Sequence, residues 1–409
     1  MSAPATGSLP CPRPGEDSPG PAGGAAPGAG ERVRAAVDAR LAQVLEEHRE
    51  RWRGLAPACD ELLDAAADLL SGGKRTRALL SALGAALLLD GDDRERALTC
   101  PVVARTGAAL ELYQASALVH DDVIDSAQTR RGMPAAHRRL AALHRDSGWL
   151  GDPEAFGRHG ALLLGDVLLS LAAGEMSALA ADRPAGPGPD AARRALARSA
   201  FDAMTAEVAV GQYLDIRSEV TPLSAPGAEP AASAQAMHEQ ALAVVRHKSA
   251  RYSVMHPVLI GALLAGVEPG SALHGALALF GEEVGTAFQL RDDDLGVFGD
   301  PRVTGKPAGD DLREGKRTVL LSLAWRMTDE EGRRALRAVL ARPGAGQADL
   351  AAAARVIEDC GAREAHEAEV EAHLAAGLAA LDGLAPGTLP EASSRSLREA
   401  ALALTRRRA

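Results

Sequence analysis

The stretch ALELYQASALVHDDVIDSAQTRRG, residues 109–132, is an apolar run that ends in three aspartates followed by two arginines. On a helix, Asp121 and Asp125 project from one face about 6 Å apart, with Asp122 beside them. Like charges at that spacing destabilise a helix unless a cation lies between them. A solvated helix end would explain a lone acidic cluster. The segment before this aspartate cluster is apolar, however, and predicts a buried helix whose carboxylates lie at the edge of the core.

A second apolar run meets acids in the same way. ALALFGEEVGTAFQL, residues 276–290, leads into FQLRDDDLGVFGDPRVTGKPAGDDLREGKRT, residues 288–318, with Asp292 and Asp293 at the junction. Two such helix ends could face one another across a helical bundle. A few partly open carboxylates suit magnesium, which keeps several waters and binds through carboxylates and substrate phosphates. An EF-hand is excluded, because the segment lacks the glycine at loop position six and the glutamate at position twelve.

The composition predicts a large helical domain. Of the 409 residues, 46% are hydrophobic but only 3% are aromatic, so the core would be built mainly from alanine, leucine and valine, a mixture dominated by helix formers. Amphipathic segments separated by short Gly/Pro or Asp/Gly breaks follow one another with almost no strand signal. We predict one all-α bundle over residues 32–409, preceded by a disordered Pro/Gly/Ala-rich tail over residues 1–31.

The net charge and the cysteines limit the possible partners and cellular location of the protein. A net charge of -10 argues against a general nucleic-acid binder, because phosphate backbones are held by basic faces. No stretch of about 18 uninterrupted apolar residues occurs, so no transmembrane segment is expected. The four cysteines, Cys11, Cys59, Cys100 and Cys360, form no CxxC pair, which favours a reducing, cytoplasmic location and offers no zinc site.

Basic residues accompany both acidic clusters. If magnesium meets phosphate oxygens there, arginine forks and lysine point charges would neutralise the rest of a diphosphate. The candidates are Lys74, Arg75, Arg77, Arg130, Arg131, Lys248, Lys306 and Lys316. The stretch SGGKRTR, residues 71–77, is not a P-loop, because Asp68 stands at the first glycine position and Arg75 follows the lysine.

Five segments, in order along the chain, carry a resemblance to a known family. They are GGKRTR (72–77), ELYQASALVHDDVIDSAQTRRGMP (111–134), GQYLD (211–215), HKSARYS (247–253) and residues 288–318. Together they resemble the trans-isoprenyl diphosphate synthase, or polyprenyl synthetase, family, and within it bacterial geranylgeranyl diphosphate synthases. The resemblance implies an isoprenoid synthase bundle, usually a homodimer, with a deep central cavity. It implies a transferase that condenses isopentenyl diphosphate with an allylic diphosphate, using three magnesium ions per site.

The resemblance also implies a role for individual residues. The metal ligands would be Asp121, Asp122, Asp125, Asp292 and Asp293. Isopentenyl diphosphate would be bound by Lys74, Arg77, Gln114 and Arg131. The allylic diphosphate would be held by Arg130, Lys248, Lys306 and Lys316. The catalytic group would comprise Lys248, Ser249, Gln289 and Lys306, with Gln212 and Asp215 supporting the metal-diphosphate site.

One position departs from the family pattern. The second cluster reads DDDLG, so Gly296 stands where many family members carry the last aspartate. Asp292 remains as the principal ligand, and Asp300 is too far along the helix to replace the missing carboxylate. We expect activity to survive this change.

The residues before the first cluster would set the length of the product. In this family they floor the cavity, and short-chain enzymes carry aromatics at the places of Ser116 and Ala117, which are small here. Tyr113, eight residues before Asp121 and about 12 Å down the helix, is the first bulky side chain. A floor at Tyr113 predicts geranylgeranyl diphosphate (C20). A Tyr113 that only packs in the core would allow C25 or longer products, and C15 is a further alternative.

Two other functions share part of this pattern. A class I terpene cyclase would have the same fold and the first aspartate cluster, but it usually carries an Asn/Ser/Glu metal triad at the second. A noncatalytic regulatory subunit would typically have lost the first cluster, which is intact here as DDVID, residues 121–125. Both therefore fit the sequence less well than a synthase.

Overall fold

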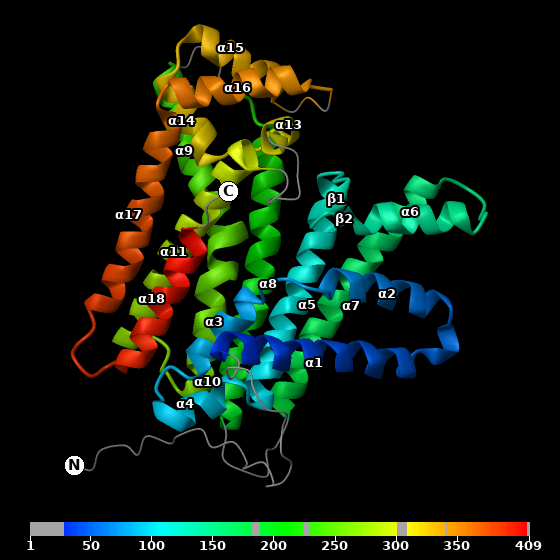
Figure 1. Cartoon of the computed structure of the whole chain (residues 1–409), viewed down its shortest axis with the longest axis vertical. Helices are drawn as coiled ribbons and strands as arrows, with labels where there is room; N and C mark the ends of the chain where they lie inside the picture. Colours follow the sequence, from blue (N-terminus) through cyan, green and yellow to red (C-terminus); the bar gives the residue numbers. More distant parts are fainter. Residues whose placement is uncertain are drawn as a thin grey trace, which may run out of the picture.

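The structure is a bundle of helices, seen from one side in Figure 1. This computed structural model describes residues 28–181, 189–223, 229–300, 309–340, 342 and 344–406. In chain order the elements are α1 (Ala29–Arg51), η1 (Arg53–Leu55), α2 (Ala58–Leu70), α3 (Thr76–Ala85), α4 (Gly91–Leu98), α5 (Pro101–Ile124), β1 (Thr129–Arg130), β2 (Met133–Pro134), α6 (Ala136–Asp146), α7 (Pro153–Ala181), α8 (Ala191–Val220), α9 (Pro230–Val244), η2 (Val245–Met255), α10 (His256–Ala265), α11 (Ala272–Phe298), α13 (Asp310–Glu314), α14 (Val319–Met327), α15 (Glu330–Val339), α16 (Gln347–Asp359), α17 (Ala362–Asp382) and α18 (Glu391–Thr405). The predicted all-α class is confirmed.

The first helix starts slightly before the predicted boundary. α1 begins at Ala29, inside the segment predicted as a tail, while residues 1–27 lie outside the described part of the chain. The backbone N–H of Gly28 donates to the carboxylate of Glu31 at 3.1 Å. This contact satisfies a backbone donor at the helix start, which is why the helix can begin there.

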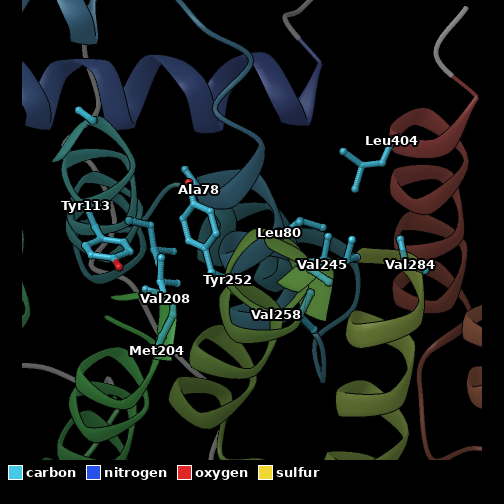
Figure 2. Close-up of a cluster of buried hydrophobic side chains, with 14 of the residues drawn as sticks. Ala78, Leu80, Tyr113, Met204, Val208, Val245, Tyr252, Val258, Val284 and Leu404 are labelled. Carbon is cyan, nitrogen blue, oxygen red and sulfur yellow. The ribbon is translucent and has the colours of Figure 1, made fainter. Parts of the chain in front are cut away.

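Helix α10 lies inside the bundle. Every residue from Pro257 to Leu264 is buried, the pattern of a helix that is enclosed on all sides. It packs against α3, and a Cβ placed on Gly261 would lie 2.7 Å from the backbone nitrogen of Ala85. Around this centre α5 packs on α7, and α11 packs on α17. Figure 2 shows part of the resulting core.

A π-helical stretch carries one of the predicted motifs. This stretch, η2, includes Lys248 and is packed between α8 and α11. A Cβ on Gly211 of α8 would lie 2.5 Å from the backbone nitrogen of Lys248, and a Cβ on Gly285 of α11 would lie 2.8 Å from the Cα of Ala250. The two glycines therefore let the flanking helices approach η2 closely and hold it in place. Such π-helical turns are frequent at functional sites.

The two acidic clusters come to the same end of the bundle (Figure 1). Helix α5 ends at Ile124 with Asp125 as its C-cap, and the antiparallel pair β1–β2 follows. Helix α11 ends at Phe298, and the short helix α13 packs against it. The bundle thus brings the two helix ends to one region, as their sequences predicted.

Helix α7 has an uncovered apolar face. Among the described residues it is the one helix long and apolar enough to cross a membrane, judged by length and composition alone, and 44% of its most apolar window is buried. The buried side packs against α5, α6 and α8. Leu162 and Leu163 are exposed on the remaining side, with exposed fractions of 43% and 59%. The helix belongs to the bundle but has apolar surface left to cover.

Candidate active site

A cavity of about 920 Å³ opens between the two acidic helix ends. Its wall is formed by α5, α8, η2 and α11, together with the turn before α3 and the segment around α13. The predicted site residues that line it are Lys74, Arg75, Arg77, Gln114, Ala117, Asp121, Arg130, Arg131, Gln212, Asp215, Lys248, Ser249, Gln289, Asp292, Asp293 and Lys316. Residues distant in the sequence therefore converge on one space.

Some of the predicted residues do not line this cavity. Four of them lie outside its wall: Tyr113, Ser116, Asp122 and Asp125. Lys306, predicted to hold the allylic diphosphate, falls in residues 301–308, outside the described part of the chain.

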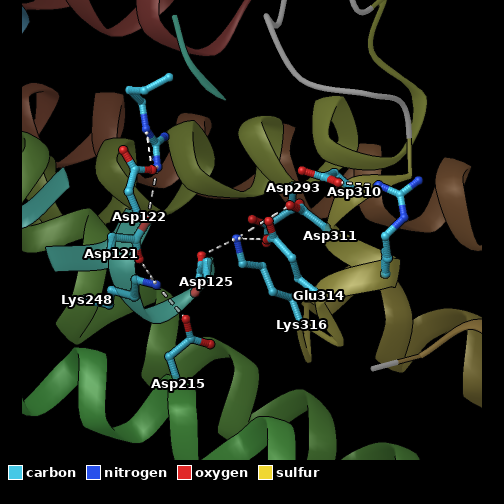
Figure 3. Close-up of polar contacts among 12 residues, drawn as sticks. Asp121, Asp122, Asp125, Asp215, Lys248, Asp293, Asp310, Asp311, Glu314 and Lys316 are labelled. Atoms are coloured by element: carbon cyan, nitrogen blue, oxygen red, sulfur yellow. Dashed lines mark hydrogen bonds and ion pairs between the residues drawn. The ribbon is translucent and has the colours of Figure 1, made fainter. Parts of the chain in front are cut away.

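Lys248 links the first cluster to α8. Its Nζ donates to Asp215 Oδ2 at 2.5 Å and to Asp121 Oδ1 at 3.2 Å (Figure 3). The side chain of Gln212 donates to the same oxygen of Asp121 at 3.2 Å. Burial raises the pKa of Asp121, but Lys248, Lys316 and Arg130 outweigh it and hold this pKa below its usual range. Asp121 is therefore an anion in a strongly positive setting.

Lys316 links the first cluster to the segment after the second. Its Nζ lies 2.7 Å from Glu314 Oε2, 3.4 Å from Asp125 Oδ2 and 3.6 Å from Asp311 Oδ1. Figure 3 shows the ammonium group between these carboxylates. Burial lowers the pKa of Lys316, yet the surrounding carboxylates raise it well above its usual value. Burial and the neighbouring Asp121 raise the pKa of Asp125 to about 6.

Arg130 is held by Asp122. Its Nε donates to Asp122 Oδ1 at 2.9 Å, its NH2 group contacts the same oxygen, and NH2 also reaches Asp121 Oδ2 at 3.4 Å. Asp122 is 0% exposed. An arginine bound by two N–H groups has a fixed direction. The structure thus places Asp122 behind Arg130 and off the cavity wall, whereas Asp121 lies on the wall.

The basic turn before α3 meets the hairpin after α5. A Cβ on Gly73, whose φ is +97°, would lie 3.2 Å from the NH1 atom of Arg131, so the glycine makes room for that guanidinium. Arg131 NH1 also reaches the carbonyl oxygen of Leu69 at 3.4 Å. Burial lowers the pKa of Arg131; Glu111 opposes this, while the neighbouring arginines add to it. Such crowded positive charge suits a polyanionic ligand.

Arg75 and Arg77 of this turn have different roles. Arg75 is 5% exposed, and its Nε donates to Asp38 Oδ1 at 2.7 Å. It also pairs with Glu111, so it anchors the turn, and it lines the cavity as well. Arg77 donates to Ser253 Oγ at 2.7 Å and lies 3.9 Å over the ring of Tyr252. Its guanidinium is thereby held at the cavity wall.

The second cluster is compact and partly buried. Gln289 donates through Nε2 to Asp293 Oδ1 at 2.9 Å. Burial, followed by the nearby Asp311 carboxylate, raises the pKa of Asp293 well above its usual value. Asp292 and Asp311 both line the cavity, so this cluster presents carboxylates from two separate segments. Asp311 lies within a quoted motif, but sequence reasoning did not single it out.

The predicted chain-length residues point in different directions. Ser116 donates to the carbonyl oxygen of Gly165 on α7 at 2.7 Å, so it does not contribute to a cavity floor. Ala117 does line the cavity. Tyr113 lies behind the wall, its hydroxyl donating to Thr205 O at 3.2 Å and its ring 5.8 Å from that of Tyr252. Figure 2 shows the two tyrosines together with Val208 and Met204.

Tyr252 is a wall residue that sequence reasoning missed. It lines the cavity and belongs to the motif HKSARYS, which was noted for its lysine and serine. Leu404 of α18 also lines the cavity, although nothing in its local sequence marks it. Only the packing of α18 against α11 brings it there.

The donor set fits magnesium. Carboxylates from α5 and α11 face one cavity, and hard oxygen donors that leave room for water and phosphate oxygens are what magnesium prefers. Within the described ranges, no three His, Cys, Asp or Glu side chains are gathered as a ready ligand set. Lys248 and Lys316 lie between the carboxylates. The aspartates of the clusters are therefore already paired with lysine side chains.

In this helical bundle, two acidic helix ends and several cations line one cavity. This combination is typical of enzymes that act on isoprenoid diphosphates. The family model described as polyprenyl synthetase matches residues 59–357, and the chain belongs to that family.

Curated and solved relatives agree with this. The chain is 32% identical to a geranylfarnesyl diphosphate synthase from Aeropyrum pernix, over 74% of this chain and 81% of that protein. It is 28% identical to a geranylgeranyl diphosphate synthase from Sulfolobus acidocaldarius, over 70% and 74% of the two chains. It is similar to a crystal structure of geranylgeranyl pyrophosphate synthase from Corynebacterium glutamicum complexed with isoprenyl diphosphate and magnesium. That match has a TM-score of 0.79, 35% identity and coverage of 93% and 100% of the two chains.

Proposed function

We propose that this protein is a magnesium-dependent prenyl diphosphate synthase that joins isopentenyl diphosphate to an allylic diphosphate. The observation that carries the proposal is the cavity itself, where two aspartate clusters and two groups of cations surround one opening. The first group, Lys248, Arg130 and Lys316, lies among the carboxylates. The second group, Lys74, Arg77 and Arg131, lines the same cavity and would offer a place for a second diphosphate.

The allylic diphosphate would bind between the aspartate clusters. Asp121 and Asp125 on one side and Asp292 on the other would hold three magnesium ions, with Gln212 and Asp215 supporting them. Magnesium bound there would stabilise the negative charge that develops on the departing diphosphate. Arg130, Lys248 and Lys316 would donate to the diphosphate as well, and Lys306 would join them. Asp122 fixes the direction of the Arg130 guanidinium.

Loss of the diphosphate leaves an allylic cation, which the double bond of isopentenyl diphosphate attacks. Lys74, Arg77, Gln114 and Arg131 would hold that second substrate with its double bond toward the cation. Ser249 and Gln289 on the wall present oxygen dipoles that ease the positive charge. The proton released in the last step would leave with the diphosphate. The apolar wall, which includes Val208 and Phe288, keeps out water that would quench the cation.

We propose geranylgeranyl diphosphate, C20, as the main product. Ala117 leaves the upper cavity open, and the Tyr252–Tyr113 pair is the aromatic barrier beside it. The named relatives include a geranylgeranyl (C20) and a geranylfarnesyl (C25) diphosphate synthase. Tyr113 would act through Tyr252, because it lies behind the wall.

We further propose a homodimer formed through α7. Its exposed Leu162 and Leu163 lie on an apolar face that a second copy would cover. Burial of this face in a dimer would explain why α7 has the length and apolar composition of a membrane-spanning helix. A cytoplasmic location is supported by Cys59 and Cys360, neither of which forms a disulfide among the described residues.

The test is incubation with labelled isopentenyl diphosphate, magnesium and dimethylallyl, geranyl or farnesyl diphosphate, followed by chain-length analysis of the dephosphorylated products. A dominant C20 alcohol is expected, with a longer product from Tyr113→Ala and a C15 product from Ala117→Phe. Diphosphate release to cyclic hydrocarbons would indicate a terpene cyclase instead. Absence of product with every primer would contradict the proposal and favour a regulatory subunit.

A further inference from the structure

Arg75 joins the basic turn before α3 to three other helices. Its Nε donates to Asp38 Oδ1 of α1 at 2.7 Å, and its NH1 group reaches Glu111 Oε2 of α5 at 3.5 Å. Its NH2 group donates to the carbonyl oxygen of Leu70, the last residue of α2. Each of the three guanidinium nitrogens therefore contacts a different helix.

The backbone of Arg75 has an uncommon conformation. Its φ of +50° lies in the left-handed region, which a side chain as large as arginine seldom adopts. Such a residue persists where its surroundings fix it. Arg75 is the N-cap of α3, with Lys74 before it and Arg77 in the first turn after it. The contacts of its guanidinium therefore fix the point at which α3 begins.

Glu111 contacts both the side chain of Arg75 and the backbone of α3. While its Oε2 faces Arg75, its Oε1 accepts from the N–H of Ala78 at 3.4 Å. Ala78 lies in the first turn of α3, where the N–H groups have no partner within the helix. A carboxylate at a helix N-terminus is also stabilised by the helix dipole. Arg75 and the start of α3 are thus held by the same buried carboxylate.

Asp38 holds Arg75 from the side of α1. This helix packs against α3 and α5, and it crosses α5 in Figure 1. The side chain of Asp38 is 45% exposed, whereas that of Arg75 is 5% exposed. Asp38 lies off the cavity wall and 37 positions from Arg75 in the sequence, so no motif marks it. Its hydrogen bond to Arg75 is its link to the site.

We propose that Asp38 is a positioning residue for isopentenyl diphosphate. The inference rests on the proposed function, in which Lys74 and Arg77 hold this substrate. Asp38 directs the guanidinium of Arg75, Arg75 fixes the turn, and the turn presents Lys74 and Arg77 at the cavity wall. The allylic diphosphate would bind between the aspartate clusters, so its binding should not depend on Asp38.

A competing explanation is that Asp38 only holds α1 against the bundle. Glu47 provides a matched control, because it lies on the same helix, its side chain is 55% exposed, and it pairs with Arg40 at 2.9 Å. Neither Glu47 nor Arg40 lines the cavity. Glu47→Gln therefore removes a carboxylate from an ion pair of α1 and leaves the basic turn intact.

The experiment is steady-state kinetics of the full chain with each substrate varied in turn, together with the melting temperature of each variant. Asp38→Asn should raise the KM for isopentenyl diphosphate by about three- to tenfold. The KM for the allylic diphosphate, kcat and the melting temperature should stay near those of the parent. Glu47→Gln should leave both KM values unchanged. An unchanged KM in Asp38→Asn, equal rises for both substrates, or an equal rise in Glu47→Gln would overturn the inference.

A double-mutant cycle tests whether Asp38 acts through Arg75. Arg75→Gln should itself raise the KM for isopentenyl diphosphate, because the turn loses its attachments. Adding Asp38→Asn should raise this KM little further, since Asp38 then has no guanidinium to direct. Independent increases that multiply would contradict the proposal.

Asp38→Glu gives a second check that does not depend on the folding of Arg75→Gln. It keeps the carboxylate, so its KM for isopentenyl diphosphate should lie nearer that of the parent than that of Asp38→Asn. The same KM in Asp38→Glu and Asp38→Asn would count against the proposal. A parent chain that elongates no primer would remove the proposed function and this inference with it. An active parent whose Asp38→Asn variant has unchanged kinetics overturns the inference alone.

Discussion

At the scale of single residues, the site consists of charges that are fixed by other charges. Lys248 is held between Asp215 and Asp121, and Lys316 lies among carboxylates from α5 and α13. Each lysine side chain is largely shielded from water, with exposed fractions of 19% and 18%, so its ion pairs are stronger than they would be in water. A phosphate oxygen that enters this region would find cations already in position, and the carboxylates would be available to bind magnesium.

The Asp122–Arg130 pair gives a residue-scale prediction. Asp122→Asn would remove the charged acceptor that directs the guanidinium, and a hydrogen bond to a charged group is worth enough to change binding about tenfold. We expect the KM for the allylic diphosphate to rise by about that factor, while the KM for isopentenyl diphosphate stays the same. Steady-state kinetics with each substrate varied in turn would check this. Equal changes in both KM values would indicate general loss of structure instead.

A second residue-scale prediction concerns pH. His366 of α17 is 1% exposed, and its Nε2 has no hydrogen-bond partner. Burial lowers its pKa to about 4, with Asp294 acting in the opposite direction. The folded pKa is below the unfolded value of about 6.5, so the unfolded chain takes up the proton first as the pH falls. The free energy of unfolding is therefore unaffected by this histidine above pH 6.5 and decreases as the pH falls from about 6.5 toward 4.

The expected loss from this histidine is about 3 kcal/mol of unfolding free energy between pH 7 and pH 4. Urea unfolding at several pH values would measure it in the parent and in His366→Leu, which cannot titrate at this position. The variant should lose stability less steeply over that range. The same slope in both proteins would show that the histidine is not buried in its neutral form.

At the scale of elements, the position of η2 determines where Lys248 and Ser249 lie. The π-helical turns are packed between α8 and α11, and small residues at the crossings allow the backbones to approach. Glu207 of α8 adds a second attachment, because it accepts hydrogen bonds from His247, Arg251 and His256. Burial raises the pKa of Glu207, but these partners outweigh it and lower the pKa to about 2.

Gly211→Ala tests this packing. The added Cβ would meet the backbone at His247 and Lys248, so η2 would have to shift. A displacement near 1 Å can cost about 100-fold in rate, and overpacking costs about 1–3 kcal/mol of stability. We expect both losses, measured by kcat and by denaturant unfolding. Gly275→Ala on α11 is the control, since nothing lies within 4 Å of its Cβ position. An active, stable Gly211→Ala protein would contradict the proposed role of this crossing.

At the scale of the whole molecule, the described helices surround the cavity between the two acidic helix ends and leave part of α7 uncovered. The apolar side of α7 that faces away from α5 and α6 includes Leu162 and Leu163, and Ile124 at the end of α5 is exposed as well. Burying such surface would stabilise an assembly by about 25 cal/mol per Å². A second copy of the chain has the same face to offer, which is the arrangement of a two-fold dimer.

Leu163→Glu should therefore convert a dimer into a monomer. A buried carboxylate without a partner is strongly unfavourable at an interface, whereas the parent leucine is apolar. Light scattering coupled to size-exclusion chromatography would give the mass of each protein. Leu150→Glu, at a residue that is 97% exposed and outside α7, should leave the mass unchanged. A parent chain that is already monomeric would contradict the predicted dimer.

The sequence alone determined the fold class and most of the wall of the site. Apolar periodicity predicted the helices, and the aspartate pairs at 121–125 and 292–293 predicted which helix ends must meet. These features are local, because helix formation and charge spacing depend on residues within a few turns of one another. The motif residues Lys74, Arg131 and Lys248 were predicted for the same reason and do line one cavity.

Only the tertiary structure decided which way individual side chains turn. The sequence places Asp122 beside Asp121 in one acidic cluster, but the structure turns Asp122 toward Arg130 and off the cavity wall, whereas Asp121 lines the cavity. Tyr252 was identified through its contact with Tyr113, and Asp311 through its contact with Gly296. Each of these contacts joins segments that are far apart in the chain. Local periodicity carries no information about these encounters, since they depend on how whole helices pack.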